Sequence, residues 1–347
     1  MKVSAISSFG VKNCATKANN STNNGATTPT QEVKNKPNFA GFMSHAVNSS
    51  RRYIDYGDIF RPNTDFYSMT RDIDRYGKAI FRKAKKYFFD MTNSVFKNVN
   101  FEKSSLQSGD FSGSTFKNTN FERTTLNNSK FLNTTMEDTS FENASLYGTK
   151  FDGAELKSGT NMRRTNLVFA DFSRADVSRA NFIDAIYADG TKFPSGFDPQ
   201  SEGMMLIQKG MNLSGQDMAK MKLRQLLFID ADMQRIKLKR ADISKAEFKN
   251  CDMKNADLTR TYAKEADLSH CDLSGAKLKQ LNLRKAYLND VDMSNANLRG
   301  ARLTWNSASS VNLRGAQYDQ FTEFVSGFNP KSHGMEYIES PLSYYGL

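Results

Sequence analysis

Residues 96–115 read FKNVNFEKSSLQSGDFSGST, and the pattern returns as FKNTNFERTTLNNSKFLNTT at 116–135 and MEDTSFENASLYGTKFDGAE at 136–155. In these three segments every fifth residue is large and apolar, so the segments align in columns. The columns are Phe96, Phe116, Met136 and Leu156; Phe101, Phe121 and Phe141; Leu106, Leu126 and Leu146; and Phe111, Phe131 and Phe151.

A period of five fits neither the α-helix, with 3.6 residues per turn, nor the β-strand, which alternates every two residues. Residues twenty positions apart resemble each other more closely than residues five positions apart. This indicates a coil with four equivalent sides of five residues each. Each side would give one large side chain to the axis. Successive coils would stack at the spacing of a β-sheet, about 4.8 Å, and the sequence therefore predicts an all-β solenoid.

The motif of a small residue, then Asp or Asn, then Leu or Phe recurs along the chain. It resembles the motif of the pentapeptide-repeat family over about 95–193 and 211–324. The resemblance implies a right-handed, four-sided β-helix and implies no activity. The triplets begin at Ala170, Ala180, Ala256, Ala266 and Ala296.

The first array departs from the family where Ala is usual, because it carries other small residues there. Where Ser or Thr at these positions is buried, its hydroxyl group needs a backbone partner. Examples are Val99, Ser104, Thr119, Thr124 and Thr139.

Two similar segments each end one array of repeats. AIYADGTKFPSGFDPQSEGM begins at Ala185 and AQYDQFTEFVSGFNPKSHGM begins at Ala316, and each contains a Pro and a Gly suited to closing a coil. We therefore expect two tandem β-helices over 95–193 and 211–324, with a terminator and linker at 194–210 and a C-terminal cap at 325–347. The first array slips by one residue near Gly159, which predicts a bulge at a corner.

Residues 1–40 are rich in Asn, Thr and Ser and predict a disordered tail, which is either without a role or an export signal. Within the N-terminal region 41–94, apolar residues recur at helical spacing over about 71–89 among many basic ones. This pattern predicts a basic amphipathic helix. It would cap the first coil at Phe96 or lie on an anionic membrane.

The chain carries a formal net charge of +11, and no apolar run reaches the roughly 18 residues of a membrane span. The N-terminus lacks the apolar segment of a signal peptide, so we expect a cytoplasmic protein, with secretion by a signal-peptide-independent route as the alternative. No nucleophile motif, phosphate loop or metal-ligand spacing is present, which predicts no enzyme activity and no cofactor. Cys251 and Cys271, one coil apart, are expected as small buried residues rather than a disulfide.

The second array concentrates most of its basic residues on two adjacent sides, whose outward positions the motif leaves free. We predict that these sides form a surface for an anionic partner. The candidate residues are Lys220, Lys222, Arg224, Lys237, Lys239, Arg240, Lys245, Arg260, Lys264, Lys277, Lys279, Arg284, Lys285, Arg299, Arg302 and Trp305.

The function expected from these features is that of a non-enzymatic scaffold that docks an acidic protein, nucleic acid or an anionic membrane surface. A secreted bacterial effector is compatible with it. The family resemblance implies an alternative, a DNA mimic that binds a topoisomerase, but mimicry needs a carboxylate-rich surface and this chain is basic. A structural spacer is a further alternative. Homodimerisation through a solenoid end, at the segment after Gly334, is also expected.

Overall fold

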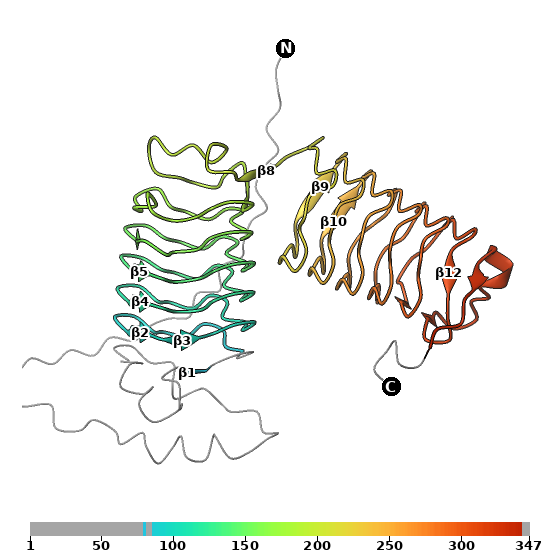
Figure 1. The fold of residues 1–347 in the computed structure, drawn as a ribbon, viewed down its shortest axis with the longest axis horizontal. Helices are drawn as coiled ribbons and strands as arrows, with labels where there is room; N and C mark the ends of the chain where they lie inside the picture. Colours follow the sequence, from blue (N-terminus) through green and yellow to red (C-terminus); the bar gives the residue numbers. More distant parts are fainter. Residues whose placement is uncertain (1–78, 81–84, 342–347) are drawn as a thin grey trace, which may run out of the picture. The chain divides into compact units, whose positions relative to one another are not determined.

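The computed structural model describes residues 79–80 and 85–341, and these residues build stacked coils (Figure 1). The described part contains no α-helix and one short 3-10 helix, η2 (Lys331–His333). Its strands are β1 (Ala79–Ile80), β2 (Val95–Lys97), β3 (Val99–Asn100), β4 (Thr115–Lys117), β5 (Thr135–Glu137), β6 (Glu155–Leu156), β7 (Ile186–Ala188), β8 (Met205–Ile207), β9 (Leu227–Ile229), β10 (Glu247–Lys249), β11 (Arg302–Leu303), β12 (Gln317–Tyr318), β13 (Glu323–Phe324) and β14 (Glu336–Tyr337).

Parallel pairing joins each coil to the next. Strands β2, β4, β5 and β6 form one sheet in that order, and Phe96 lies opposite Phe116. In the second array, single parallel bridges continue at intervals of twenty residues, from Asn212 with Asp232 to Asn297 with Gln317. The predicted all-β solenoid is therefore confirmed, and this part of the second array runs without a slip.

The core consists of the predicted apolar columns, in which every residue is at most 1% exposed. Parallel pairing places like side chains above like, so the aromatic rings stack. The ring centroids of Phe96 and Phe116 lie 4.6 Å apart with 5° between their planes, and those of Phe121 and Phe141 lie 5.0 Å apart. Burial of these large rings supplies the main driving force for the stack.

The small inward residues of the first array bond to the neighbouring coil. Thr124 donates its hydroxyl to the carbonyl of Phe101 at 2.9 Å, and Thr119 donates to that of Phe96 at 3.1 Å. Both Thr side chains are buried. The hydroxyl groups that replace the usual Ala are thus satisfied by the backbone, as the sequence required.

The predicted slip near Gly159 is confirmed. Ser140 pairs with Asn161, an interval of 21 residues, whereas Asn120 pairs with Ser140 at the regular interval of twenty. Gly159 has a φ of +77°, in the left-handed region that glycine adopts without strain. One extra residue is thus accommodated at a turn, and the apolar columns keep their alignment.

The helix expected over about 71–89 is wrong for the residues that the structure describes. Strand β1 pairs with β3, and Lys85 and Asp90 form parallel bridges with Ser105 and Asp110. All of these pairings keep the twenty-residue interval. Pairing with the open edge of the next coil satisfies backbone groups that this edge would otherwise leave unpaired. Residues 71–78 and 81–84 lie outside the described part, as does the tail expected at 1–40.

The two similar segments adopt the same local structure. Ile186 of β7 pairs with Met205 of β8, and Gln317 of β12 pairs with Glu336 of β14, both at an interval of 19 residues. In each segment a backbone N–H donates to the Pro carbonyl, from Met204 to Pro199 at 3.0 Å and from Met335 to Pro330 at 3.2 Å.

Buried apolar residues form two clusters. One extends from Phe89 to Met204, and the other lies mainly between Ile207 and Met335. Among the described residues, no helix has the length and apolar character needed to cross a membrane.

Candidate functional site: a basic ridge on the second array

One column of outward turn residues in the second array is basic. Lys220, Arg240 and Arg260 occupy equivalent positions in successive coils, with φ values of 67°, 59° and 59°. The N–H of each donates to a carbonyl of the following coil, as Lys220 does to Lys239 at 3.0 Å. The left-handed turn at these positions points the chain around a corner, and their side chains are exposed.

The preceding turn column adds three more basic residues. We call the two columns together the basic ridge, and its six bases are Lys220, Lys239, Arg240, Arg260, Lys279 and Arg299. Over these coils the remaining members of the two columns carry no charge; they are Ala219, Thr259, Gln280 and Gly300. No carboxylate belongs to the ridge, and coils stack at about 4.8 Å, so like charges are neighbours along it.

The adjoining strand column differs, because its charges alternate. The backbones of Asp217 and Lys237, of Lys237 and Asp257, and of Asp257 and Lys277 form parallel β-bridges. The two predicted site residues Lys237 and Lys277 therefore have carboxylates in the coils beside them. Their contribution to a positive surface is smaller than that of the ridge.

The second predicted basic side is neutralised in part. Lys222 and Arg224 both lie near Asp242, with N–O distances of 3.8 and 3.4 Å. Burial lowers the pKa of Lys222, and the Asp242 carboxylate opposes that shift. Asp242 lies in the next coil, and its single carboxylate offsets part of the positive charge of these two bases.

Glu265 neutralises two further bases of that side. Its carboxylate lies 3.2 Å from the ammonium of Lys264 and 3.4 Å from that of Lys245. The hydrogen bond from Lys264 lowers the pKa of Glu265, and Lys245 adds to that shift. Arg302 is likewise paired, with Glu323 at 3.1 Å.

Three residues complete the predicted set. Arg284 and Lys285 are exposed turn residues on the second side. Trp305 is half-buried, and its ring meets that of Phe328 edge-on at a centroid distance of 5.6 Å. Trp305 therefore packs against the segment that closes the second array, and its ring is only in part available to a partner.

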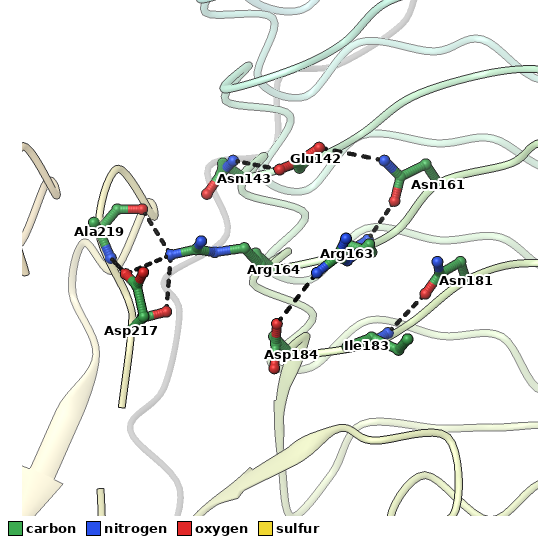
Figure 2. Close-up of polar contacts among 10 residues, drawn as sticks. All are labelled: Glu142, Asn143, Asn161, Arg163, Arg164, Asn181, Ile183, Asp184, Asp217 and Ala219. Carbon is green, nitrogen blue, oxygen red and sulfur yellow. Dashed lines mark hydrogen bonds and ion pairs between the residues drawn. The ribbon is translucent and has the colours of Figure 1, made fainter. Parts of the chain in front are cut away.

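Arg164 of the first array lies at one end of the ridge (Figure 2). Its Nη2 atom donates to the carbonyl of Ala219 at 3.0 Å and to Asp217 at both its carbonyl, at 2.8 Å, and its carboxylate, at 3.0 Å. Asp217 is therefore paired with Arg164, and Lys237 in the next coil also attracts its carboxylate. No pattern in the sequence predicts this contact, because 53 residues separate the two side chains.

The acidic column of the second array has a structural role. Each Asp accepts a hydrogen bond from the backbone N–H two residues later, as Asp272 does from Ser274 at 2.9 Å. Such bonds fix the turn that follows a strand position. The four residues of the column are Asp232, Asp252, Asp272 and Asp292, and all make this bond.

Cys251 and Cys271 are buried free thiols, as predicted. The Cys271 thiol donates to the carbonyl of Phe248 at 3.2 Å. Its hydrogen bond with Cys251, followed by burial, raises the pKa of Cys271 far above its ordinary value. In the described part of the chain, no group of three or more His, Cys, Asp or Glu side chains is placed to hold a metal ion.

Comparison with known proteins agrees with this geometry. The family model for pentapeptide repeats matches eight copies, at residues 119–157, 158–186, 222–260, 241–280, 266–304 and 286–317. A search of curated proteins found no match.

Several solved structures are similar to the chain. The pentapeptide repeat protein HetL, from the cyanobacterium Nostoc sp. strain PCC 7120, is 19% identical with a TM-score of 0.26, covering 70% of this chain and 92% of HetL. Full-length QnrB1, a plasmid-mediated fluoroquinolone resistance protein, is 13% identical with a TM-score of 0.16, covering 75% of this chain and 92% of QnrB1. The repeat match and the stacked five-residue columns together identify the chain as a member of the pentapeptide-repeat family.

Proposed function

We propose that this protein is a non-enzymatic scaffold that docks an anionic partner through the basic ridge. One observation carries the proposal. The two turn columns of the ridge hold bases of a single sign, whereas the neighbouring columns alternate in sign or pair their bases with carboxylates. The ridge is therefore a continuous strip of positive charge without a carboxylate, and the second side adds bases that are neutralised only in part.

This concentration is unfavourable for the isolated fold. Exposed like charges in adjacent positions destabilise by a few tenths of a kcal/mol per pair. The motif does not require bases there, since Thr259 and Gln280 occupy equivalent turn positions. A partner with negative charge would offset the repulsion on binding, which gives the ridge a reason to retain its bases.

The ridge suits a partner with a line of negative charge. Its bases lie in five successive coils, so at sheet spacing the ridge is roughly 19 Å long. Nucleic acid, an acidic protein segment and an anionic membrane surface all offer such charge. The shared chemistry is electrostatic, so binding would weaken as the salt concentration rises.

The organisation of the chain belongs to the same proposal. We assign two tandem right-handed β-helices to 95–193 and 211–324, supported by two apolar clusters and two matching terminator segments. The second array carries the ridge, and the first would position it. A cytoplasmic location, or release by a signal-peptide-independent route as an effector, remains part of this hypothesis, as does homodimerisation through a solenoid end.

DNA mimicry is the second candidate, because the chain shares its family with QnrB1, whose name records fluoroquinolone resistance. A DNA mimic must present carboxylates where DNA presents phosphates. The ridge presents bases instead, so its charge opposes this function. Inhibition of DNA gyrase by stoichiometric amounts of the protein would nevertheless favour mimicry over docking.

The docking proposal is tested by titrating the full chain against anionic vesicles, duplex DNA and single-stranded RNA at two salt concentrations. The ridge variant carries Lys239→Glu, Arg240→Glu and Lys279→Glu. The matched control carries Arg235→Glu, Lys249→Glu and Arg314→Glu, which changes the net charge equally but lies outside the ridge.

We expect one ligand class to bind in a salt-sensitive manner, with at least tenfold weaker binding by the ridge variant and little change in the control. Equal weakening in both variants would show that net charge alone drives binding. If none of the three ligands binds, the remaining partner is an acidic protein. Such a protein would be captured by the wild-type chain and not by the ridge variant. Unchanged capture by the ridge variant would refute the proposal.

A further inference from the structure

A pocket of about 440 Å³ opens beside the C-terminal end of the basic ridge. Its lining includes Arg260 and Gln280 from one column of the ridge. It also includes Tyr262 and Arg302, which belong to the strand column that follows the ridge in each coil. This volume lies within the range of small-molecule binding pockets, roughly 300 to 1,000 Å³. The pocket is thus large enough for a small ligand and lies against charged and aromatic side chains.

At one turn in the pocket wall, a glycine occupies the position that holds a long side chain in the two preceding coils. Arg260, Gln280 and Gly300 are equivalent turn residues of three successive coils, and Gly300 has a φ of +68°. Arg260 and Gln280 have long side chains, whereas Gly300 has none. Gly300 forms part of the pocket wall.

A loop closes the far side of the pocket. The Gly300 N–H donates to the carboxylate of Asp319 at 2.8 Å and to the hydroxyl of Thr322 at 3.1 Å. The same Asp319 carboxylate accepts the N–H of Phe321 at 3.1 Å, and Phe321 lines the pocket. Arg302 pairs with Glu323 at an interval of 21 residues, so this loop holds one residue more than a regular coil.

The charges of the pocket suit a ligand with one strong negative group. Arg260 donates its Nε–H to the amide oxygen of Gln280 at 2.5 Å, which orients the guanidinium without neutralising it. Arg302 is paired with Glu323 at 3.1 Å. Two guanidinium groups and one carboxylate leave a single net positive charge, and Glu323 opposes a polyphosphate while offering an acceptor for hydroxyl groups.

The remaining walls suit a flat ring with polar edges. Tyr262 is 58% exposed, and Phe321 is half-buried. Both line the pocket together with the amide of Asn282. A base can stack on an aromatic ring and hydrogen-bond to an amide at its edge, and stacking of this kind stabilises binding.

We propose that this pocket binds a single ribonucleotide carrying one phosphate. Arg260 binds the phosphate, Tyr262 and Phe321 contact the base, and Glu323 accepts hydrogen bonds from the ribose hydroxyls. The chemistry is shared by a free nucleoside monophosphate and by one unit of single-stranded RNA. The inference goes beyond the docking function, because it rests on the pocket and does not require a macromolecule along the ridge.

The test is calorimetric titration of the full chain with AMP, UMP, dAMP, inorganic phosphate and a short single-stranded RNA. Gly300→Asn adds to the pocket wall a residue that tolerates the left-handed conformation, as Asn255 and Asn295 do in this array. Gly215→Asn is the matched control, since Gly215 has a φ of +71° and a Cβ atom added there would meet open space. Arg260→Ala removes the phosphate partner.

We expect binding of a ribonucleotide, at least tenfold weaker binding by Gly300→Asn and Arg260→Ala, and unchanged binding by Gly215→Asn. Weaker binding of dAMP than of AMP would support the contact between Glu323 and the ribose. Binding of free nucleotides identifies a small-molecule site, and binding of the RNA alone identifies a site for one unit of a strand. If neither binds, or if Gly300→Asn binds as the wild type does, the inference is wrong.

This result is separable from that of the docking experiment. Gly300→Asn leaves all six bases of the ridge in place, so docking of a macromolecule should persist when nucleotide binding is lost. The loss of both activities in Gly300→Asn, with an unchanged melting temperature, would show that the pocket is not an independent site and would overturn the inference.

Discussion

Arg164 donates from its Nη2 atom to a carboxylate oxygen of Asp217 at 3.0 Å, across 53 residues of sequence. The Arg164 side chain is 19% exposed and that of Asp217 is 52% exposed. Although partial burial opposes the shift, the Ala219 N–H and the Arg164 guanidinium lower the pKa of Asp217. The carboxylate part of this contact therefore stabilises the fold only while Asp217 is ionised, whereas the bonds from Arg164 to the two backbone carbonyls do not depend on that charge.

Replacing this charge gives a prediction about pH. Asp217→Asn keeps an acceptor for the Ala219 N–H and removes the charge that Arg164 contacts. A carboxyl with a lowered folded pKa adds stability above its unfolded pKa, about 3.9, and loses it as the pH falls through the folded pKa. Asp217→Asn should thus cost about 0.5 to 1 kcal/mol at pH 7 and nothing near pH 2, as measured by urea unfolding at each pH. An equal cost at both values would contradict the ionic contribution.

The inward assignment of the Phe columns gives a second prediction. Phe121 is fully buried and stacks on Phe101 and Phe141. Phe121→Asp places an unpaired carboxylate on the axis and should cost several kcal/mol of unfolding free energy, seen as a large drop in melting temperature.

The adjacent residue Glu122 is the control for that change. Burial, followed by the neighbouring carboxylates of Glu142 and Glu102, raises the pKa of Glu122. Glu122→Lys removes this repulsion and should leave the melting temperature equal to or slightly above that of the wild type. Equal melting temperatures for Phe121→Asp and Glu122→Lys would contradict the assignment of sides.

The matching terminators predict matching effects of substitution. Gly203 and Gly334 have φ values of 73° and 71°, and a methyl group added at either would meet no atom closer than 3.6 Å. Alanine at either position is therefore strained but not obstructed, at a cost of about 1 to 2 kcal/mol. Thermal unfolding should show similar losses for Gly203→Ala and Gly334→Ala, with smaller losses for Asn. A loss at only one position would show that the two segments differ in conformation.

The buried thiols predict a chemical result. Cys251 and Cys271 are 1% and 2% exposed, and the raised pKa of Cys271 keeps that thiol protonated at neutral pH. In a Cys14→Ser background, a thiol reagent should react with the native protein at most slowly, and with two thiols after denaturation. Rapid labelling of the folded protein would indicate that the coils at these residues open readily.

The sequence predicted the parts of the fold that depend on a repeated register. The columns that contain Phe101 and Leu106, and the slip at Gly159, follow from spacing alone, because stacking aligns equal positions. The helix expected over 71–89 was wrong in the described part, because Ala79 and Lys85 pair with the next coil at the twenty-residue interval.

The candidate site was predicted only in part. The sequence located the basic residues on two sides but did not predict their partners. Asp242 and Glu265 form ion pairs with bases of the second side, and these pairs depend on side-chain geometry. The pocket had no signal in the repeat pattern. It depends on a missing side chain at Gly300 and on an irregular loop that places Phe321 beside it.

The bonding between coils has a mechanical consequence. The Asp257 N–H donates to the Ile236 carbonyl in the preceding coil, and the Leu258 N–H donates to the Lys277 carbonyl in the following coil, so a coil is held by the coils directly before and after it. A force applied at one end therefore loads the terminal coil first, and each coil released lengthens the chain by roughly twenty residues, up to about 70 Å. A chain that unravels one coil at a time can be drawn through a narrow opening without all of its core separating at once.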